Sequence, residues 1–469
     1  MRLGSTDTAA QPAAVTTSAP VRALTGWVLV DWALQPFYTL VLTFLFAPYF
    51  TTAVASDPVH GQAMWGYAAA IAGILIAIGS PLLGAMADGR GRRKPWVALF
   101  AAITAGGMAM LWLAEPGADT TTIVLVLAVF IAATAVAEFP TVFTNAIMPT
   151  LVPPSRLGRL SGIGWAVGYA GGLVSLALMA GLLVANPATG KTLLGLEPLL
   201  SLDLIAREGD RLVGPFSALW LIVFILPFFL FVPDKPAAAP AQPHGSPIRE
   251  LIATLRGLTK QRDMLMFLIA RALYTDGLSA IFVFGGIYGT AVFGWQAFER
   301  GIFGIVLISV GIVGALLGGA LDDKLGAKRV VIGSLVLLAI GSIGILSVAP
   351  GLVLFTLPVE AKAAGSQPFS SSGELVFLAF AVVVAIAAAP NQAASRTLLA
   401  RLAPPERMTQ YFGLFAFSGK VTAFLAPLSV AAVTTLTGSQ RAGMASILFF
   451  LIVGLLLMLP VREKRPPDS

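Results

Sequence analysis

The stretch G-A-M-A-D-G-R-G-R-R-K (Gly84–Lys94) separates two long apolar runs near the start of the chain. A second stretch, G-A-L-D-D-K-L-G-A-K-R (Gly319–Arg329), takes the same place about half a chain length later. Both fit the pattern G-x-x-x-D-x-x-G-x-[RK]-[RK], in which Asp88 corresponds to Asp323. A small residue lets two helices approach, the aspartate closes a helix end, and the glycine turn presents basic side chains. One copy is typical of any basic loop, but two copies at this interval indicate duplicated halves.

The composition places the chain in a membrane. Of its 469 residues, 57% are hydrophobic and only 11% are charged, whereas soluble domains carry about 25% charged residues. Soluble enzymes, DNA-binding proteins and disordered scaffolds are therefore excluded, and the net charge of +7 is assigned to membrane-facing loops. There is no cysteine, and both histidines, His60 and His244, lie outside the apolar runs. We therefore expect a membrane protein that is not an enzyme, with no cofactor, no metal and no nucleic-acid partner.

Twelve apolar stretches are long enough to cross a bilayer as helices, which takes about 20 residues each. Their sequences lack the alternation of barrel strands. The predicted spans are 25–50, 64–87, 96–114, 122–148, 161–185, 216–233, 264–293, 301–321, 330–349, 374–395, 411–434 and 443–460. The predicted domains are a disordered tail (1–23), a first six-helix bundle (24–233), a linker with a short amphipathic helix (234–262), a second six-helix bundle (263–460) and a tail (461–469).

The positive-inside rule predicts the orientation of these spans. If both ends of the chain are cytoplasmic, 22 of the 30 Lys and Arg residues fall in inner segments and 6 in outer loops. The 22 inner residues include Arg396 and Arg401, which we assign to an inner loop. We therefore expect a multi-pass membrane protein with both termini in the cytoplasm.

The paired loops resemble the signature loop of the major facilitator superfamily, which follows helix 2 and recurs after helix 8. Further strings are similar to its vacuole-effluxer branch, the fungal vacuolar amino-acid effluxers linked to autophagy and their bacterial relatives. They are V-D-W-A-L-Q-P-F-Y (Val30–Tyr38), S-G-I-G-W-A-V-G-Y-A-G-G (Ser161–Gly172), A-R-A-L-Y-T-D-G (Ala270–Gly277) and Y-F-G-L-F-A-F-S-G-K-V-T-A-F-L-A-P (Tyr411–Pro427). The resemblance implies an all-α integral membrane fold of twelve helices in two six-helix bundles, a monomer in a bacterial plasma membrane.

The resemblance also implies a conformational latch in the two loops. Its members in the first loop are Gly84 and Asp88 with Arg92 and Arg93. Its members in the second loop are Gly319 and Asp323 with Lys328 and Arg329. In each loop the aspartate is expected to pair with the basic residues. Gly89 departs from the family pattern, in which Arg or Lys stands at this position.

Five ionisable residues fall inside predicted spans: Asp31, Glu138, Arg271, Asp276 and Lys420. Each costs at least about 2.5–3.5 kcal/mol at the bilayer centre, so each is a candidate for function. A rise of 1.5 Å per residue places all five at a depth of roughly 9–18 Å from the inner boundary. This common depth predicts one shared chamber.

Helical spacing adds polar neighbours to these charges. Glu138 lies on a stripe with Thr134, Thr141 and Asn145, and Asp31 shares a face with Gln35 and Tyr38. The resemblance implies that helices 1, 4, 7 and 10 line a central cavity, with helix 11 beside helix 7. The remaining candidates for the cavity wall are Trp165, Tyr274, Asn391 and Gln392.

These residues predict a secondary active transporter that moves a small zwitterionic solute, such as an amino acid, by alternating access. Lys420 or Arg271 is expected to bind its carboxylate, and Asp31 or Asp276 its ammonium group. Glu138 or Asp276 is the candidate for carrying a coupling proton. Three alternatives stay open: structural ion pairs between bundles, such as Glu138 with Lys420 or Arg271; proton-linked efflux of drug-like compounds; and a non-transporting receptor or scaffold.

Overall fold

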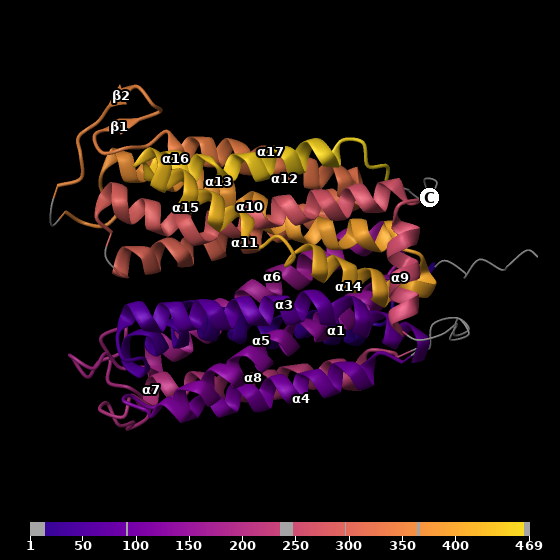
Figure 1. Cartoon of the computed structure of the whole chain (residues 1–469), viewed down its shortest axis with the longest axis horizontal. Helices are drawn as coiled ribbons and strands as arrows, with labels where there is room; N and C mark the ends of the chain where they lie inside the picture. The colour runs from indigo at the N-terminus through magenta and orange to yellow at the C-terminus, as the bar shows by residue number, and fades with distance from the viewer. Residues whose placement is uncertain (1–14, 91, 235–246, 296, 364–365, 464–469) are drawn as a thin grey trace, which may run out of the picture.

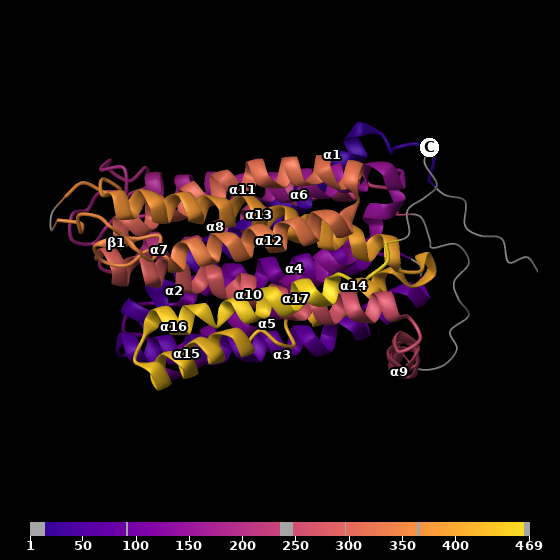
Figure 2. The same cartoon turned by 90° about the horizontal axis from the view of Figure 1, so that it is seen from above.

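The structure, a computed structural model, describes residues 15–90, 92–234, 247–295, 297–363 and 366–463. Most of the predicted tails and linker (1–14, 235–246 and 464–469) lies outside this described part. Figures 1 and 2 show long helices that run along one common axis. One end of the bundle carries Asp88 and Asp323, close to α9 (Pro247–Leu258), and we call it the latch end. The opposite end carries α7 (Glu208–Arg211) and a short hairpin, and we call it the far end.

The first half of the chain forms the lower body in Figure 1. Its first span continues beyond α1 through two π-helical stretches, Phe37–Phe44 and Phe50–Val54. A third π-helical stretch, Met179–Leu183, extends the fifth span. Besides α7, its helices are α1 (Val21–Pro36), α2 (Phe46–Tyr49), α3 (Pro58–Arg90), α4 (Lys94–Met110), α5 (Thr120–Ile147), α6 (Leu157–Leu178) and α8 (Val213–Phe231).

The second half forms the upper body in Figure 1. At the far end, strands β1 (Leu352–Val353) and β2 (Leu357–Pro358) pair antiparallel in a loop for which the sequence predicted no element. The helices of this half are α10 (Arg262–Phe293), α11 (Ala297–Leu325), α12 (Ala327–Leu346), α13 (Ser372–Leu402), α14 (Met408–Ser418), α15 (Leu425–Thr437), α16 (Gln440–Ala445) and α17 (Ile447–Met458).

Eleven helical segments of the described chain are long and apolar enough to cross a membrane, and each coincides with a predicted span. The remaining predicted span, 411–434, is not one helix. It is divided into α14 and α15 by the turn 419–424, so the prediction of a continuous eleventh helix was wrong. The boundary at 395 was also wrong, because α13 continues through Pro390 to Leu402.

Small residues join the two halves. Helix α6 packs against α11, and α3 packs against α14. A Cβ at Gly158 would lie 2.7 Å from the carbonyl oxygen of Gly319, and one at Gly162 would collide with the carbonyl oxygen of Ala315. Only glycine allows the α6 and α11 backbones to approach this closely.

The outer surface of the bundle is apolar. On α3, exposed side chains recur at helical spacing at Ile71, Ile74, Leu75 and Ile78. Such a stripe has no protein partner in the described chain and suits hydrocarbon, while the helices satisfy their own backbone hydrogen bonds. The structure is therefore an all-α integral membrane bundle, as the composition predicted.

Candidate functional site

The carboxylate of Asp88 binds the start of a helix in the other half. Its Oδ2 accepts the amide N–H of Gln410 at 2.8 Å, and its Oδ1 accepts that of Thr409 at 3.2 Å. Both donors belong to the first turn of α14, whose free amide groups carry partial positive charge. Gly84 makes the approach possible, because a Cβ there would lie 2.6 Å from the carbonyl oxygen of Thr409. Arg93 completes the cluster, with its guanidinium 3.4 Å from Asp88 and 2.8 Å from the Thr409 hydroxyl.

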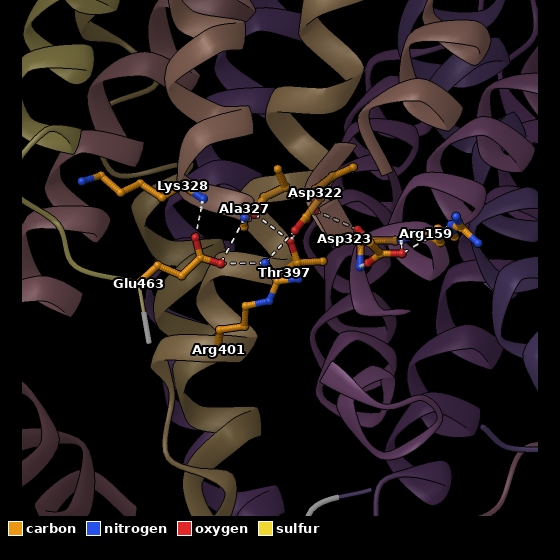
Figure 3. A network of polar contacts seen from close by, with 12 residues as sticks. Arg159, Asp322, Asp323, Ala327, Lys328, Thr397, Arg401 and Glu463 are labelled. Atoms are coloured by element: carbon orange, nitrogen blue, oxygen red, sulfur yellow. Dashed lines mark hydrogen bonds and ion pairs between the residues drawn. The ribbon is translucent and has the colours of Figure 1, made fainter. Parts of the chain in front are cut away.

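Asp323 makes the equivalent contact in the opposite direction. Its Oδ1 accepts the amide N–H of Gly158 at 2.8 Å, and its Oδ2 accepts that of Arg159 at 3.2 Å. These amides open α6 in the first half, and the Arg159 Nε lies 3.6 Å from Asp323 Oδ2 (Figure 3). Each duplicated loop therefore caps a helix of the other half, and together they close the latch end.

Of the basic partners expected at the latch, Arg93 pairs with Asp88, whereas Arg92, Lys328 and Arg329 do not pair with the loop aspartates in the described chain. Lys328 does not lie beside Asp323: its Nζ donates to the carbonyl oxygen of Leu459 at 2.7 Å, and its amide donates to Glu463 at 3.0 Å. The reason is that α12 starts at Ala327, directly after a glycine turn, so Lys328 belongs to the first turn of that helix. Arg92 and Arg329 are exposed and form no ion pair with the residues that the structure describes.

A second charged cluster lies beside the Asp323 contact and was not anticipated. Arg401 places Nη1 2.6 Å from Asp322 and 2.7 Å from Glu463, as Figure 3 shows. Asp322 is 1% exposed and also accepts the hydroxyl of Thr397. Ala87 occupies the corresponding position before Asp88, so the duplicated pattern itself gave no signal for this cluster.

Arg396 is the main residue that the sequence analysis missed. It projects from α13 into the first half, where its Nη1 lies 3.2 Å from Asp31 Oδ2 and 3.1 Å from Asn145 Oδ1. Its Nε and Nη2 donate to the hydroxyl and the carbonyl oxygen of Ser161 at 2.9 and 2.7 Å. The guanidinium also lies 5.0 Å from the ring centre of Trp27. One arginine of the second half thus binds α1, α5 and α6 of the first.

Glu138 and Lys420 form a further ion pair between the halves, besides those of Asp31 with Arg396 and of Asp323 with Arg159. The Lys420 Nζ lies 3.3 Å from Glu138 Oε1. The Lys420 side chain is 37% exposed and that of Glu138 is 21% exposed, whereas the Arg396 side chain is only 5% exposed. The two carboxylates are similarly exposed, with Asp31 at 23%, so the pairs differ in their cations: Lys420 is accessible, whereas Arg396 is buried.

Lys420 lies in the break between α14 and α15, and two predicted site residues hold that break. Arg271 donates through Nη1 to the carbonyl oxygen of Phe415 at 2.5 Å and to the hydroxyl of Ser418 at 2.8 Å. Asp276 accepts the amide N–H of Ala426 at 3.0 Å. A cation at the end of α14 and an anion at the start of α15 complement the two helix dipoles. The sequence did not show that these charges are engaged with helix ends.

The remaining predicted residues lie in a half-buried group around Tyr169, in a buried group around Ser395 and along the first span. The Gln392 amide donates to the Tyr169 hydroxyl at 3.4 Å, and Trp165 packs edge-on against Tyr169. The Tyr274 hydroxyl lies 2.7 Å from that of Ser395.

Asn391 is 1% exposed and shares its helical face with Ser395. Neither polar atom of its side chain has a partner among the described residues. In the first span, Gln35 donates to Thr39 at 3.4 Å, and Tyr38 is half-buried. These residues are therefore not gathered around a single ion pair.

Two six-helix halves joined by reciprocal loop contacts define a transporter of the major facilitator superfamily. The fold agrees with solved structures of the proton:xylose symporter XylE (TM-score 0.66, 13% identity, 94% of this chain and 95% of that one). It also agrees with the transporter FucP in its outward conformation (TM-score 0.69, 13% identity, 95% and 99%).

The chain belongs to the family described as vacuole effluxer Atg22 like, whose model matches residues 54–467. It is 23% identical over 453 residues to the uncharacterized MFS-type transporter YxiO of Bacillus subtilis, covering 94% of this chain and 95% of YxiO. It is 26% identical over 312 residues to autophagy-related protein 22 of Cryptococcus neoformans, covering 63% of this chain and 51% of that protein. The chain thus spans about half the length of that fungal relative. The resemblance noted from the sequence is confirmed, and the chain is a transporter rather than an enzyme.

Proposed function

We propose that this transporter moves a small zwitterionic solute, an amino acid or a similar metabolite, and that Glu138 and Lys420 bind it. The observation that carries the proposal is the partly exposed ion pair between these residues, 3.3 Å apart and shared by the two halves. A zwitterion offers both charges: its ammonium group can replace Lys420 beside Glu138, and its carboxylate can replace Glu138 beside Lys420. Neither embedded charge is then left unpaired, which is the condition for binding charges away from water.

The other embedded charges support this assignment because they are already bound to protein groups. Arg271 is bound to the end of α14, and Asp31 is bound by the buried Arg396. Using either for the solute would require breaking contacts that hold helices. We therefore assign Asp31 and Arg396 to closing the latch end, and Glu138 and Lys420 to the solute.

Alternating access follows if the latch end opens. The contacts that must separate are those of Asp88 with α14, Asp323 with α6 and Arg396 with Asp31. The positive-inside rule assigns the latch end to the cytoplasm, with both termini on that side. With this orientation the present conformation is closed toward the cytoplasm. We expect the protein to act as a monomer in a bacterial plasma membrane.

Asp276 is the candidate for proton coupling. Its Oδ1 is buried and has no hydrogen-bond partner among the described residues, while Oδ2 accepts the Ala426 amide. A proton on Oδ1 would remove an unpaired charge and leave the helix cap in place. Asp276 holds the start of α15, and Lys420 lies in the turn that precedes this helix, so the proposed proton carrier and the proposed solute-binding cation border the same helix break.

The test is solute counterflow in proteoliposomes with a panel of amino acids, amines, carboxylates and drug-like cations. We expect amino acids to exchange, and Glu138→Gln and Lys420→Gln each to abolish exchange. The matched control is Glu115→Gln, which removes an exposed carboxylate from an ion pair with Arg211 at the far end and should leave exchange intact. Exchange of drug-like cations without amino acids would overturn the zwitterion proposal in favour of drug efflux. No exchange of any solute, with undiminished binding, would favour a receptor.

A further inference from the structure

A depression at the latch end lies away from the ion pairs described above. It is formed where α10 begins, where α12 begins and where α17 ends. Its lining consists of Arg262, Asp263, Lys328, Leu459, Pro460 and Arg462. None of these residues contributes to the Glu138–Lys420 pair or to the loop contacts of Asp88 and Asp323.

The depression has an excess of positive charge. Three cationic side chains face one carboxylate, and that carboxylate is engaged, because Asp263 Oδ1 accepts the amide N–H of Arg462 at 2.9 Å. The neighbouring Glu463 is engaged as well, by the amides of Ala327 and Lys328 and by Arg401. Within the described chain, the three cations form no ion pair. A ligand of this depression is therefore an anion.

The position of the depression indicates a lipid rather than a solute in bulk water. Helix α17 is wholly apolar from Ile447 to Met458, and the depression begins at the next residue, Leu459, which is 51% exposed. Arg262 is likewise the first residue of a membrane-spanning helix. The three cations thus lie where hydrocarbon gives way to headgroups, with an apolar side chain directly beside them. Basic pockets between helices at this depth bind anionic lipid headgroups.

The first half of the chain repeats the backbone contact of Lys328 but has no counterpart of Arg462. Lys94 donates to the carbonyl oxygen of Phe229 at 2.8 Å, as Lys328 does to Leu459. The residues after Phe229, up to Pro233, are uncharged, whereas Arg462 follows shortly after Leu459. The duplicated fold alone therefore does not require a cation at the position of Arg462.

We propose that this depression binds the phosphodiester headgroup of an anionic phospholipid, with Arg262, Lys328 and Arg462 around the phosphate and an acyl chain along Leu459. The site is independent of the solute and of the direction of transport. A bound lipid would hold the starts of α10 and α12 together with the end of α17.

Native mass spectrometry of the full chain in detergent tests the site, with phosphatidylglycerol and phosphatidylcholine of identical acyl chains as probes. We expect tighter binding of phosphatidylglycerol. The triple variant R262Q/K328Q/R462Q should lose at least about tenfold in that affinity, given roughly 1 kcal/mol for each basic residue near an anionic surface. The matched control R22Q/R92Q/R156Q removes three exposed arginines of the first half at the latch end and should bind as the unmodified chain does.

Equal binding of the two lipids, or unchanged phosphatidylglycerol binding by the triple variant, would overturn the proposal. If the triple variant fails to purify as a monodisperse protein, R462Q alone should still weaken phosphatidylglycerol binding, and unchanged binding would count against the site. A further arm adds inorganic phosphate or glycerol phosphate. Displacement of the lipid by either at millimolar concentration would reassign the depression to a soluble phosphate ligand.

Discussion

Arg396 and Asp31, far apart in the sequence, meet in an ion pair of 3.2 Å that joins the second half of the transporter to the first. The same guanidinium binds Asn145 and Ser161, so a single side chain contacts three helices of the opposite half. These contacts must break whenever the latch end opens. Arg396 is therefore the residue whose loss should most strongly shift the balance between the two conformations.

Arg396→Gln should open the latch end. The substitution leaves Asp31 without its cation, and breaking one side of a buried pair costs about 3–5 kcal/mol. Because the natural chain has no cysteine, Arg92→Cys and Glu406→Cys provide a spin-label pair across the two halves at the latch end without background labelling. We expect a longer distance in the Gln variant and an intermediate one in Arg396→Lys. An unchanged distance distribution in Arg396→Gln would contradict the assignment.

Asp88→Asn and Asp323→Asn should each weaken closure of the same end by about 1–2 kcal/mol. Each substitution removes a negative charge from the start of a helix while keeping one acceptor for its amides. The measured quantity is again the population of the longer spin-label distance. Since the two contacts are reciprocal, the double variant should show a larger shift than either single variant. A shift in only one of the two would indicate that the halves do not contribute equally.

Gly162→Val should prevent closure by steric conflict rather than by charge. A Cβ at this position collides with the carbonyl oxygen of Ala315, so α6 and α11 must separate. Overpacking of this kind costs about 1–3 kcal/mol. Gly106→Val, where a Cβ meets no atom within 4 Å, is the matched control in the first half. We expect a lower melting temperature and a more open latch end for Gly162→Val only.

The charge-reversed pair Glu138→Lys with Lys420→Glu distinguishes a solute site from a structural pair. Each single reversal places two like charges side by side and should reduce protein yield and transport. If the pair were only structural, the double reversal should restore both. We expect it to restore yield and thermal stability but not transport, because a bound amino acid would meet the wrong orientation of charges. Recovery of full exchange activity would show that the pair does not bind the solute.

Asp276→Asn tests proton coupling without removing the helix cap. The asparagine carbonyl oxygen can still accept the Ala426 amide, but the side chain no longer binds a proton near neutral pH. We expect counterflow to persist and accumulation driven by a pH gradient to disappear. Proteoliposomes loaded at one pH and diluted into another report both quantities. If the variant still accumulates solute against its gradient, the coupling proton is carried elsewhere.

Much of the fold is determined locally and could be predicted from the sequence. The hydropathy of each span is a local property, and so is the repeated loop around Asp88 and Asp323. Partner choice at the loops is not local. Lys328 follows Asp323 closely in sequence, yet it turns toward Leu459 because α12 begins just before it.

The two ion pairs inside the bundle, Asp31 with Arg396 and Glu138 with Lys420, also depend on packing between distant segments. The break in 411–434 was missed because its turn, G-K-V-T-A-F (Gly419–Phe424), keeps three apolar residues within a long and mostly apolar stretch. Arg396 was assigned to a loop because basic residues after an apolar run usually mark its end. Its true partners, Asp31 and Ser161, are distant in sequence, and only the packing of α13 against α6 brings them together. From the sequence, either Lys420 or Arg271 could pair with Glu138. In the structure the partner is Lys420.

The carboxylates of Asp88 and Asp323 each accept two backbone amide groups at the start of a helix. When the halves part at this end, the starts of α14 and α6 lose those acceptors simultaneously, and a buried amide without an acceptor is costly. Water has to arrive as the carboxylates leave. Opening is therefore a hydration step as much as a mechanical one, and osmolytes that withdraw water from crevices will hold the molecule in the conformation described above.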